Sequence, residues 1–532
     1  MNARLMRSPA LLPFLFTFAA LAFWVFHYGS HWPYRDGFIY LRKLDELSDG
    51  KLSISNLLTS RDNQHPIAFQ IVIALLFLKV FPGSIWSIVV GNAAMLWLSA
   101  VVLYVTAAQS LASRKQKFLL ACFICASTLT GSQASSLLWE FQIWFYCNLL
   151  LLALNLLLTE RYGLRAYPIV ALFCLFATGN EAQGAFLWLV AAAHMLYVTS
   201  TNVKRNVRIA GVVILAAHVM IFLALAWTLS HLQYGGAPSV DANPTLPGRL
   251  IFSVQLLGGG FGVKDPSIAF VFGLMSLLAW GVGTFFAACR KFALMIDRVA
   301  FLICGVSLMW TAAFAMARAS FGIAWALSEF HGSLMMIPLY AGIGMYATSM
   351  LAETALGWRV AALCLSAFTL SPVLTGMHFA RQQSVLLKVN SLLAAAVECT
   401  NVSVPAALKQ NLSGLRTNDD IYAEIDRHRS ELCGVQPNLS RAVEALKIPP
   451  YYAEQISKDP RVGDALQALW YQYLSRQDLR EAYPLSDPHL AHDLLKWGAV
   501  EAATATSGDE QALAQYATTL KMLVEQLDGS PS

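Results

Sequence analysis

Residues 30–66 gather the side chains best suited to chemistry in this sequence. They form a polar stretch between the first two hydrophobic segments of a chain that is only 13% charged. Asp36 follows the first apolar run closely, and Asp62 and His65 lie just before the next one. Side chains of these types could coordinate a hard divalent cation such as Mg²⁺ or Mn²⁺, with Asp36 as a ligand, or could act as catalytic acids and bases.

The competing interpretation of this stretch is a solvated polar connector. That interpretation suits Asp45, Glu46 and Asp49, which lie among lysines near an expected helix end. Asp36 differs because it follows Trp-Pro-Tyr-Arg at the end of an apolar run, where a carboxylate is expected at the depth of the lipid headgroups. We therefore expect Asp36, Asp62 and His65 to be catalytic residues.

Polar residues inside apolar segments are a second source of chemistry, because such groups are costly there and are either functional or mutually paired. Three groups stand out: Gln133, Glu140, Gln142 and Asn148; Asn180, Glu181 and Gln183; and Arg318, Glu329 and His331. Arg318 directly follows an apolar run and suits a phosphate. Glu140, Gln142, Glu329 and His331 are the other candidate substrate-binding residues. The alternatives are helix ends at the interface, interhelical hydrogen bonds and, for Arg318, a side chain that snorkels to the headgroups.

The elements that must position these residues are membrane helices. Of 532 residues, 57% are hydrophobic and the mean hydropathy is +0.53, whereas soluble domains are about 45–50% apolar. Runs that approach or reach the roughly 20 residues of a spanning helix are 11–29, 67–81, 84–108, 118–133, 137–158, 168–199, 209–230, 266–288, 299–317, 333–350 and 360–379. We predict an all-α, polytopic bundle of about 11–13 transmembrane helices, with a break in the run 168–199 at 178–181.

The distribution of Lys and Arg orients the chain, because cytoplasmic loops carry the excess of positive charge. The basic residues within 2–7, 204–208 and 290–298 are expected inside, which places 30–66, 318–332 and the segment after 380 outside. Placing Arg114, Lys115 and Lys117 inside conflicts with a simple count of the short runs around them. We expect a multi-pass protein of the cell inner (plasma) membrane, with membrane lipids as partners and no nucleic acid.

The sequence changes character near residue 380. We expect residues 1–379 to form the transmembrane domain, with 30–66 as an outer loop, and residues 380–532 to form a small helical, extracytoplasmic soluble domain. That tail carries 14 Lys and Arg against 19 Asp and Glu, and its apolar residues recur with helical spacing. Its only two cysteines are Cys399 and Cys433. Because thiols in an oxidising compartment tend to pair, we predict a disulfide between them.

The order of these features resembles the GT-C superfamily of polyprenyl-phosphate-dependent glycosyltransferases, and more closely a group of bacterial polytopic membrane proteins. The resemblance covers about residues 10–380 and depends on topology and four short motifs: Asp36-Gly37, Asn63-Gln64-His65-Pro66, Phe141-Gln142 and Arg318-x3-Gly322-x3-Ala326-Leu327-Ser328. The sequence departs from the pattern at Gln64 and Pro66, where Glu and Arg are expected, and at Glu329-Phe330, where Arg-Tyr is expected.

The resemblance implies a glycosyltransferase that moves a sugar, with inversion, from a polyprenyl-phosphate donor to an extracytoplasmic glycan or lipid acceptor. Asp36 would be the general base or a metal ligand, and Arg318 would bind the donor phosphate. Two other classes stay open. The broken run near 178–183 favours a transporter or flippase of a lipid-linked or anionic substrate, and the motif departures leave room for a non-catalytic assembly protein on the same fold.

Overall fold

The computed structural model describes residues 9–30, 33, 37–58, 61–62, 65–81, 84–130, 133–200, 205–230, 245–323, 327, 331–351, 355–400, 427–428, 430 and 432–433. The chain divides into two compact units. The first comprises residues 1–29 and 39–384, and the second comprises residues 30–38 and 385–532. Asp36 and Glu329, two of the predicted site residues, lie outside the described residues.

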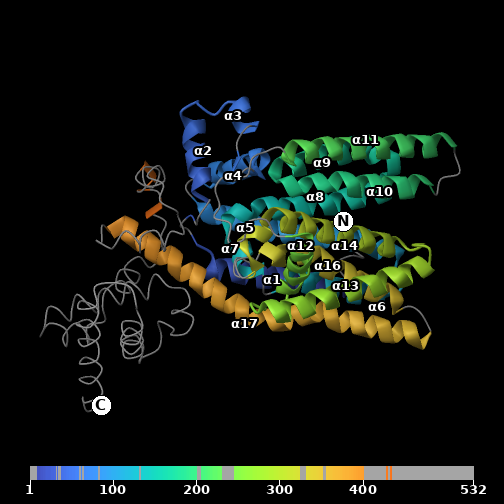
Figure 1. The fold of residues 1–532 in the computed structure, drawn as a ribbon. Coiled ribbons are helices and arrows are strands. Elements are labelled where there is room, and N and C mark those ends of the chain that lie inside the picture. The colour runs from blue at the N-terminus through green and yellow to red at the C-terminus, as the bar shows by residue number, and fades with distance from the viewer. Residues whose placement is uncertain are drawn as a thin grey trace, which may run out of the picture. The chain divides into compact units, whose positions relative to one another are not determined.

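Helices form nearly all of the described structure (Figure 1). The α-helices are α1 (Leu11–Tyr28), α2 (Phe38–Ser48), α3 (Ile54–Leu58), α4 (Ala68–Val80), α5 (Ile85–Ala107), α6 (Arg114–Thr128), α7 (Ala134–Leu138), α8 (Ile143–Tyr162), α9 (Tyr167–Asn180), α10 (Phe186–Ser200), α11 (Arg205–Ser230), α12 (Leu246–Gly259), α13 (Pro266–Cys289), α14 (Met295–Arg318), α16 (His331–Met350) and α17 (Leu356–Thr400). Short 3-10 turns join several of them: η2 (Ala108–Ser110), η4 (Glu140–Gln142), η5 (Gly163–Ala166), η6 (Ala182–Ala185) and η7 (Ala319–Phe321). The two strands, β1 (Arg61–Asp62) and β2 (His65–Pro66), pair antiparallel.

Six described helical segments are long and apolar enough to cross a membrane: Leu11–Tyr28, Ile85–Ser110, Glu140–Asn180, Pro266–Cys289, Met295–Arg318 and Leu356–Met377. Four shorter apolar helices accompany them, namely Ala68–Val80, Gln183–Thr199, Ile209–Leu225 and Leu334–Met350. The predicted all-α, multi-pass membrane class is therefore confirmed. The predicted total of about 11–13 crossings stays a prediction.

Several predicted runs have different bounds in the structure. The run 137–158 is not one helix, because α7 ends at Leu138 and α8 begins only at Ile143. The run 168–199 is broken near the predicted place, between α9 and α10. The stretch 30–66 is more ordered than a connector, since it contains α2, α3 and the β1–β2 pair. The helix α12 was not predicted, since its 14 residues fall short of a span.

Helices α1 and α5 pack against each other in opposite directions. The rings of Phe14 and Tyr104 lie 5.1 Å apart between their centroids, while Trp86 Nε1 donates to the carbonyl of Val25 over 3.4 Å. The start of α1 therefore packs against the end of α5, and its end against the start of α5. Helices that cross the bundle in this way have their connections in two sets, one at each end.

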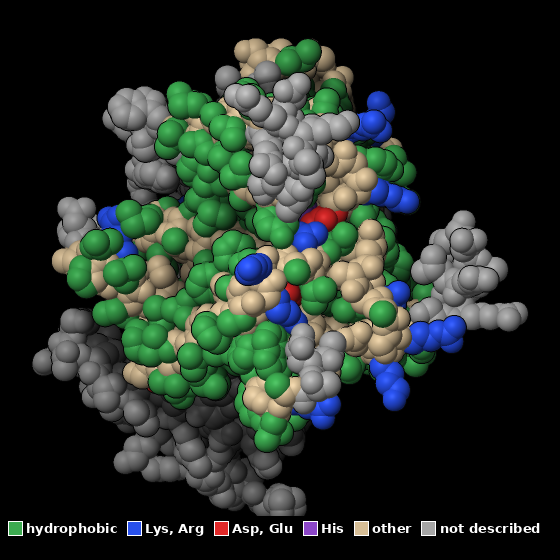
Figure 2. Space-filling model, turned by 90° about the vertical axis from the view of Figure 1, so that its right-hand side faces the viewer, with side chains coloured by type: hydrophobic (Ala, Val, Ile, Leu, Met, Phe, Trp, Pro, Cys, Tyr) green, Lys and Arg blue, Asp and Glu red, His purple; other side chains and the backbone are tan. Residues whose placement is uncertain are grey.

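One end of the bundle brings four connections together, namely η2–α6, α8–α9, α13–α14 and α16–α17. Three contacts show this: Ile296 N donates to Ser110 Oγ (3.2 Å), Arg298 Nη2 lies 3.0 Å from Glu160 Oε2, and the Arg290 guanidinium lies 5.0 Å from the ring centroid of Trp358. Lys and Arg gather there, as Figure 2 shows. We call this the basic end; it carries Arg114, Lys115, Lys117, Arg161, Arg165, Arg290, Lys291, Arg298 and Arg359.

The start of α6 shows how strongly positive this end is. Ser113 and Gln116 form a capping box around the first turn. That turn carries Arg114, Lys115 and Lys117 and no acidic residue. The positive end of the helix dipole lies at the same place, so these cations are locally unfavourable. The dipole of α6 therefore disfavours the positive charges in its own first turn.

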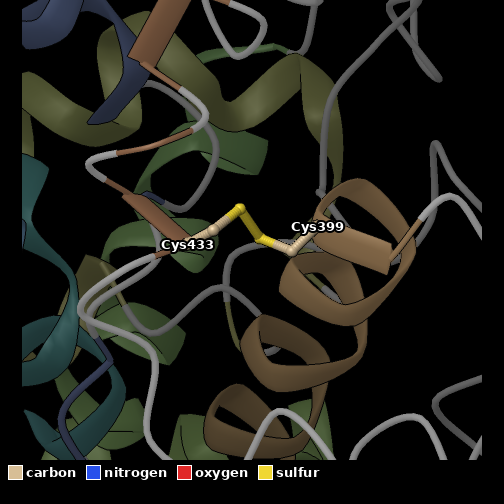
Figure 3. Close-up of a disulfide and its surroundings, with 2 residues drawn as sticks. All are labelled: Cys399 and Cys433. Carbon is tan, nitrogen blue, oxygen red and sulfur yellow. A yellow bond between two sulfur atoms is a disulfide. The ribbon is translucent and has the colours of Figure 1, made fainter.

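The described part of the second unit contains a disulfide between Cys399, near the end of α17, and Cys433 (Figure 3). Their Cα atoms lie 5.7 Å apart, and 34 positions separate them in the sequence. The predicted pairing is confirmed. Most of the small helical domain predicted for residues 380–532 lies outside the described residues.

Candidate functional site

An irregular segment inside the bundle separates α6 from α8. It contains α7, an extended Trp139 and the 3-10 turn η4. Asn92 Nδ2 of α5 donates to the carbonyls of Leu137 (3.2 Å) and Trp139 (3.1 Å). Gln70 Nε2 of α4 donates to the carbonyl of Phe141 (3.0 Å). Non-helical backbone in an apolar interior needs partners for its carbonyls, and these two distant amides supply them.

A second break lies between α9 and α10. Glu181 is extended, with φ −167° and ψ 148°, and turns the chain out of α9 into η6. Trp310 Nε1 of α14 donates to the carbonyl of Gln183 (2.9 Å). A Cβ at Gly184 would lie 1.9 Å from the carbonyl oxygen of Ala177, so only glycine fits where the turn folds back on α9.

The two breaks meet in one place, because Asn180 Nδ2 at the end of α9 donates to Asn148 Oδ1 of α8 over 3.1 Å. This bond joins two polar groups that are separate in the sequence. We call their buried members the buried polar cluster: Gln133, Glu140, Gln142, Asn148, Asn180 and Glu181. Its carboxylates are deeply buried: Glu140 is 2% exposed and Glu181 is 4% exposed. Helices α8 and α10 begin just after these residues, and the positive ends of their dipoles favour negative charge there.

Arg318 lies at the same end of the bundle as this cluster. It is the last residue of α14 and is half-buried. Trp310, which donates to the η6 backbone, lies eight positions earlier on α14. Eight residues of helix correspond to about 12 Å along the axis. A guanidinium at this position can reach a substrate whose other end lies at the breaks.

The remaining predicted site residues have less described around them. Asp62 and His65 pair directly in the β1–β2 register, and β2 lies beside α9. His331 is the first residue of α16, and its side chain lies outside what is described. The structure therefore places the polar cluster and Arg318 at the same end of the bundle, with the β2 backbone beside α9.

A metal site is not built by the described residues alone. Among them, no group of three or more His, Cys, Asp or Glu side chains comes together. Asp36, the predicted ligand, lies outside that part of the chain. A divalent cation held by Asp36 thus stays a prediction.

Sequence reasoning missed Gln70, Asn92 and Tyr40. Gln70 and Asn92 are fully buried, and Gln70 Nε2 also donates to Tyr40 Oη over 2.5 Å. A usable indication was present, because Gln70 and Asn92 are the only carboxamides in the apolar runs 67–81 and 84–108. Isolated carboxamides in membrane helices are expected to have partners inside the bundle.

The basic end contains two buried ion networks centred on the α13–α14 turn. In the first, Glu160 of α8 accepts from Arg298 Nε (3.1 Å) and Nη2 (3.0 Å), and lies 2.8 Å from His194 Nε2. Arg298 Nη1 also donates to the carbonyls of Phe292 and Ala293, and its guanidinium lies 4.9 Å from the ring centroid of Tyr197. This network joins α8, α10 and α14.

The second network joins α13, α14 and α16. Arg290 Nη2 donates to Asp297 Oδ1 and to Ser349 Oγ, each over 2.7 Å. The sequence identified Arg290 and Arg298 only as orientation signals, and it missed Glu160, His194 and Asp297. Paired charges of this kind fix helix positions, so we assign the basic end a structural role.

Comparison of the chain with protein-family models, with curated proteins and with solved structures finds no match. The resemblance to the GT-C superfamily accordingly stays a prediction.

Proposed function

We propose that this chain is a glycosyltransferase of the bacterial inner membrane, transferring a sugar from a polyprenyl-phosphate donor to an extracytoplasmic glycan or lipid acceptor. One observation carries the proposal: a buried polar cluster with two carboxylates lies at the end of the bundle opposite the basic end. Helix α8 connects the two, since it has 20 residues and is therefore about 30 Å long. The cluster surrounds its first turns and Glu160 lies in its last.

Charge supports the outward orientation of the cluster. Positive residues mark the cytoplasmic ends of membrane helices, and the Lys and Arg residues named above gather at the basic end. The opposite end, with the cluster and Arg318, then faces the extracytoplasmic side. The Cys399–Cys433 disulfide supports the same side for the second unit, because disulfides form and persist in oxidising compartments.

The proposed chemistry assigns a role to each predicted residue. Asp36 removes the proton from the acceptor hydroxyl, and a divalent cation on Asp36 would lower the pKa of that hydroxyl. Asp62 and His65 are the other candidate acid and base groups. Arg318 stabilises the phosphate that leaves. The other substrate-binding residues are Glu140 and Gln142 in η4, together with Glu329 and His331.

Transport is the second candidate, favoured by the break between α9 and α10. Discontinuous helices with their starts directed at a buried polar site are typical of transporter binding sites. A transporter would move the lipid-linked or anionic substrate without breaking a bond. This difference in outcome makes the two candidates separable.

The test is turnover in sealed membrane vesicles that contain polyprenyl phosphate carrying a radiolabelled hexose. Transfer of label to a glycan or lipid acceptor, with release of polyprenyl phosphate, supports the transferase. Movement of intact labelled lipid between leaflets supports the transporter. Vesicles from cells lacking the chain are the control, and equal turnover in both would exclude the proposed activity.

A further inference from the structure

The two breaks are surrounded by hydrogen-bonding capacity that the protein does not use. Six buried amide oxygens near them have no hydrogen-bond partner among the described residues: Gln70 Oε1, Asn92 Oδ1, Gln133 Oε1, Gln142 Oε1, Asn180 Oδ1 and Gln183 Oε1. A buried polar atom without a partner is unfavourable by about 1–3 kcal/mol. A concentration of such atoms in an apolar bundle therefore calls for a ligand or for water.

The orientation of three of these amides is fixed by what they donate to. Asn92, Gln70 and Gln133 direct their NH₂ groups at backbone carbonyls, of Trp139, Phe141 and Thr128 among others. Carbonyls accept and never donate, so exchanging the oxygen and nitrogen of these amides would break the bonds. Their unpaired atoms are thus oxygens, and the capacity left over is acceptor capacity.

Two groups near the breaks have unused capacity of other kinds. Asn148 Nδ2 is a donor, and Tyr146 Oη can both donate and accept; both are buried without a partner. A metal ion could use the oxygens but not the Asn148 donor. A phosphate could use that donor but not the oxygens, because its own oxygens only accept. A hydroxyl both donates and accepts, so several hydroxyls on one ring match the whole set.

We propose that the amide oxygens at the two breaks form a subsite for the sugar ring, separate from a phosphate subsite at Arg318. This assignment depends on the proposed function. It divides the donor site into one part that binds the sugar and another that binds the phosphate. The sugar hydroxyls donate hydrogen bonds to Gln142 Oε1 and Gln183 Oε1. The phosphate lies toward the end of α14, about 12 Å along that helix from Trp310. The subsite recognises a neutral polyhydroxy group and not the charge of the donor.

The test compares two lipids on the purified full-length protein in nanodiscs. One is bare polyprenyl phosphate, and the other is polyprenyl phosphate carrying glucose, mannose or N-acetylglucosamine. Gln142→Leu and Gln183→Leu should each lower affinity for the best-bound sugar lipid about tenfold, while affinity for the bare lipid changes less than about twofold. Gln142→Glu, which retains an acceptor oxygen, should retain the preference for the sugar lipid.

Asn155→Leu is the matched control. Asn155 is a buried amide on α8, donates to Cys174 Sγ (3.6 Å) and also has an unpaired oxygen, but it lies seven positions beyond Asn148, about 10 Å along the helix. It should leave both affinities unchanged. Equal loss for both lipids, no loss in either glutamine variant, or the same loss in Asn155→Leu would overturn the sugar subsite and leave the proposed function standing. A wild-type protein that binds neither lipid would overturn both.

Discussion

Removal of the Arg298 guanidinium should destabilise the protein strongly. Arg298→Met keeps most of the side-chain volume, but it removes two bonds to Glu160, two bonds to backbone carbonyls and the ring contact with Tyr197. The Glu160 side chain is only 5% exposed, so its carboxylate would stay buried. Breaking a buried pair in this way typically costs 3–5 kcal/mol. Because His194 stays 2.8 Å from Glu160, we expect the lower value, about 3 kcal/mol.

The assay is reversible unfolding in mixed micelles of a mild detergent and SDS, which gives a free energy of unfolding for each variant. Lys291→Met is the control, because Lys291 is exposed in the same turn and should change stability by no more than about 0.5 kcal/mol. Adding Glu160→Gln to Arg298→Met should recover part of the loss, since no buried carboxylate is then left without its main partner. A loss below about 1 kcal/mol in Arg298→Met, or one equal to that of Lys291→Met, would refute the reasoning.

Three further predictions concern orientation, the disulfide and catalysis. A reporter that is active only in the cytoplasm, fused after Ser532, should be silent, and strong activity would contradict the proposed orientation. Peptide mapping after maleimide labelling should find Cys399 and Cys433 modified only after reduction, and modification of both without reductant would show that the pair does not form in the cell. Because the disulfide closes a loop of 34 positions, its loss should destabilise the second unit by about 4 kcal/mol through the entropy of the unfolded chain. Asp36→Asn should abolish sugar transfer with donor binding retained, and full turnover in this variant would remove Asp36 from the mechanism. Arg318→Ala should weaken donor binding by about 2–3 kcal/mol. Asp45→Asn, which lies with Asp36 in residues 30–66, is the control and should change neither transfer nor donor binding.

The sequence predicted those features of the fold that depend on local composition. Long apolar runs marked the spanning helices, and polar residues near 180 marked the break between α9 and α10. The disulfide could be predicted because the tail was expected in an oxidising compartment and has only two cysteines, Cys399 and Cys433. These inferences needed no knowledge of which helices are neighbours.

What the sequence could not predict depends on contacts between distant segments. The run 137–158 is predicted as one segment, yet it contains the end of α7, an extended Trp139 and the 3-10 turn η4 before α8 begins. The distant amides of Gln70 and Asn92 donate to its carbonyls. The union of the two polar groups depends on one bond between Asn148 and Asn180, 32 positions apart. Spacing along the chain does not show such pairs, so Glu140 and Glu181 were identified as candidates without being placed together.

The first turn of α6 shows that stability and biogenesis make opposite demands on the same residues. Arg114, Lys115 and Lys117 oppose the helix dipole, each by a few tenths to about 1 kcal/mol, so a glutamate at any of them would strengthen the finished helix. In the proposed orientation, the same cations would help to retain this connection on the cytoplasmic side during membrane insertion. Substitutions that stabilise this turn against heat would therefore remove a topology signal that acts only during membrane insertion.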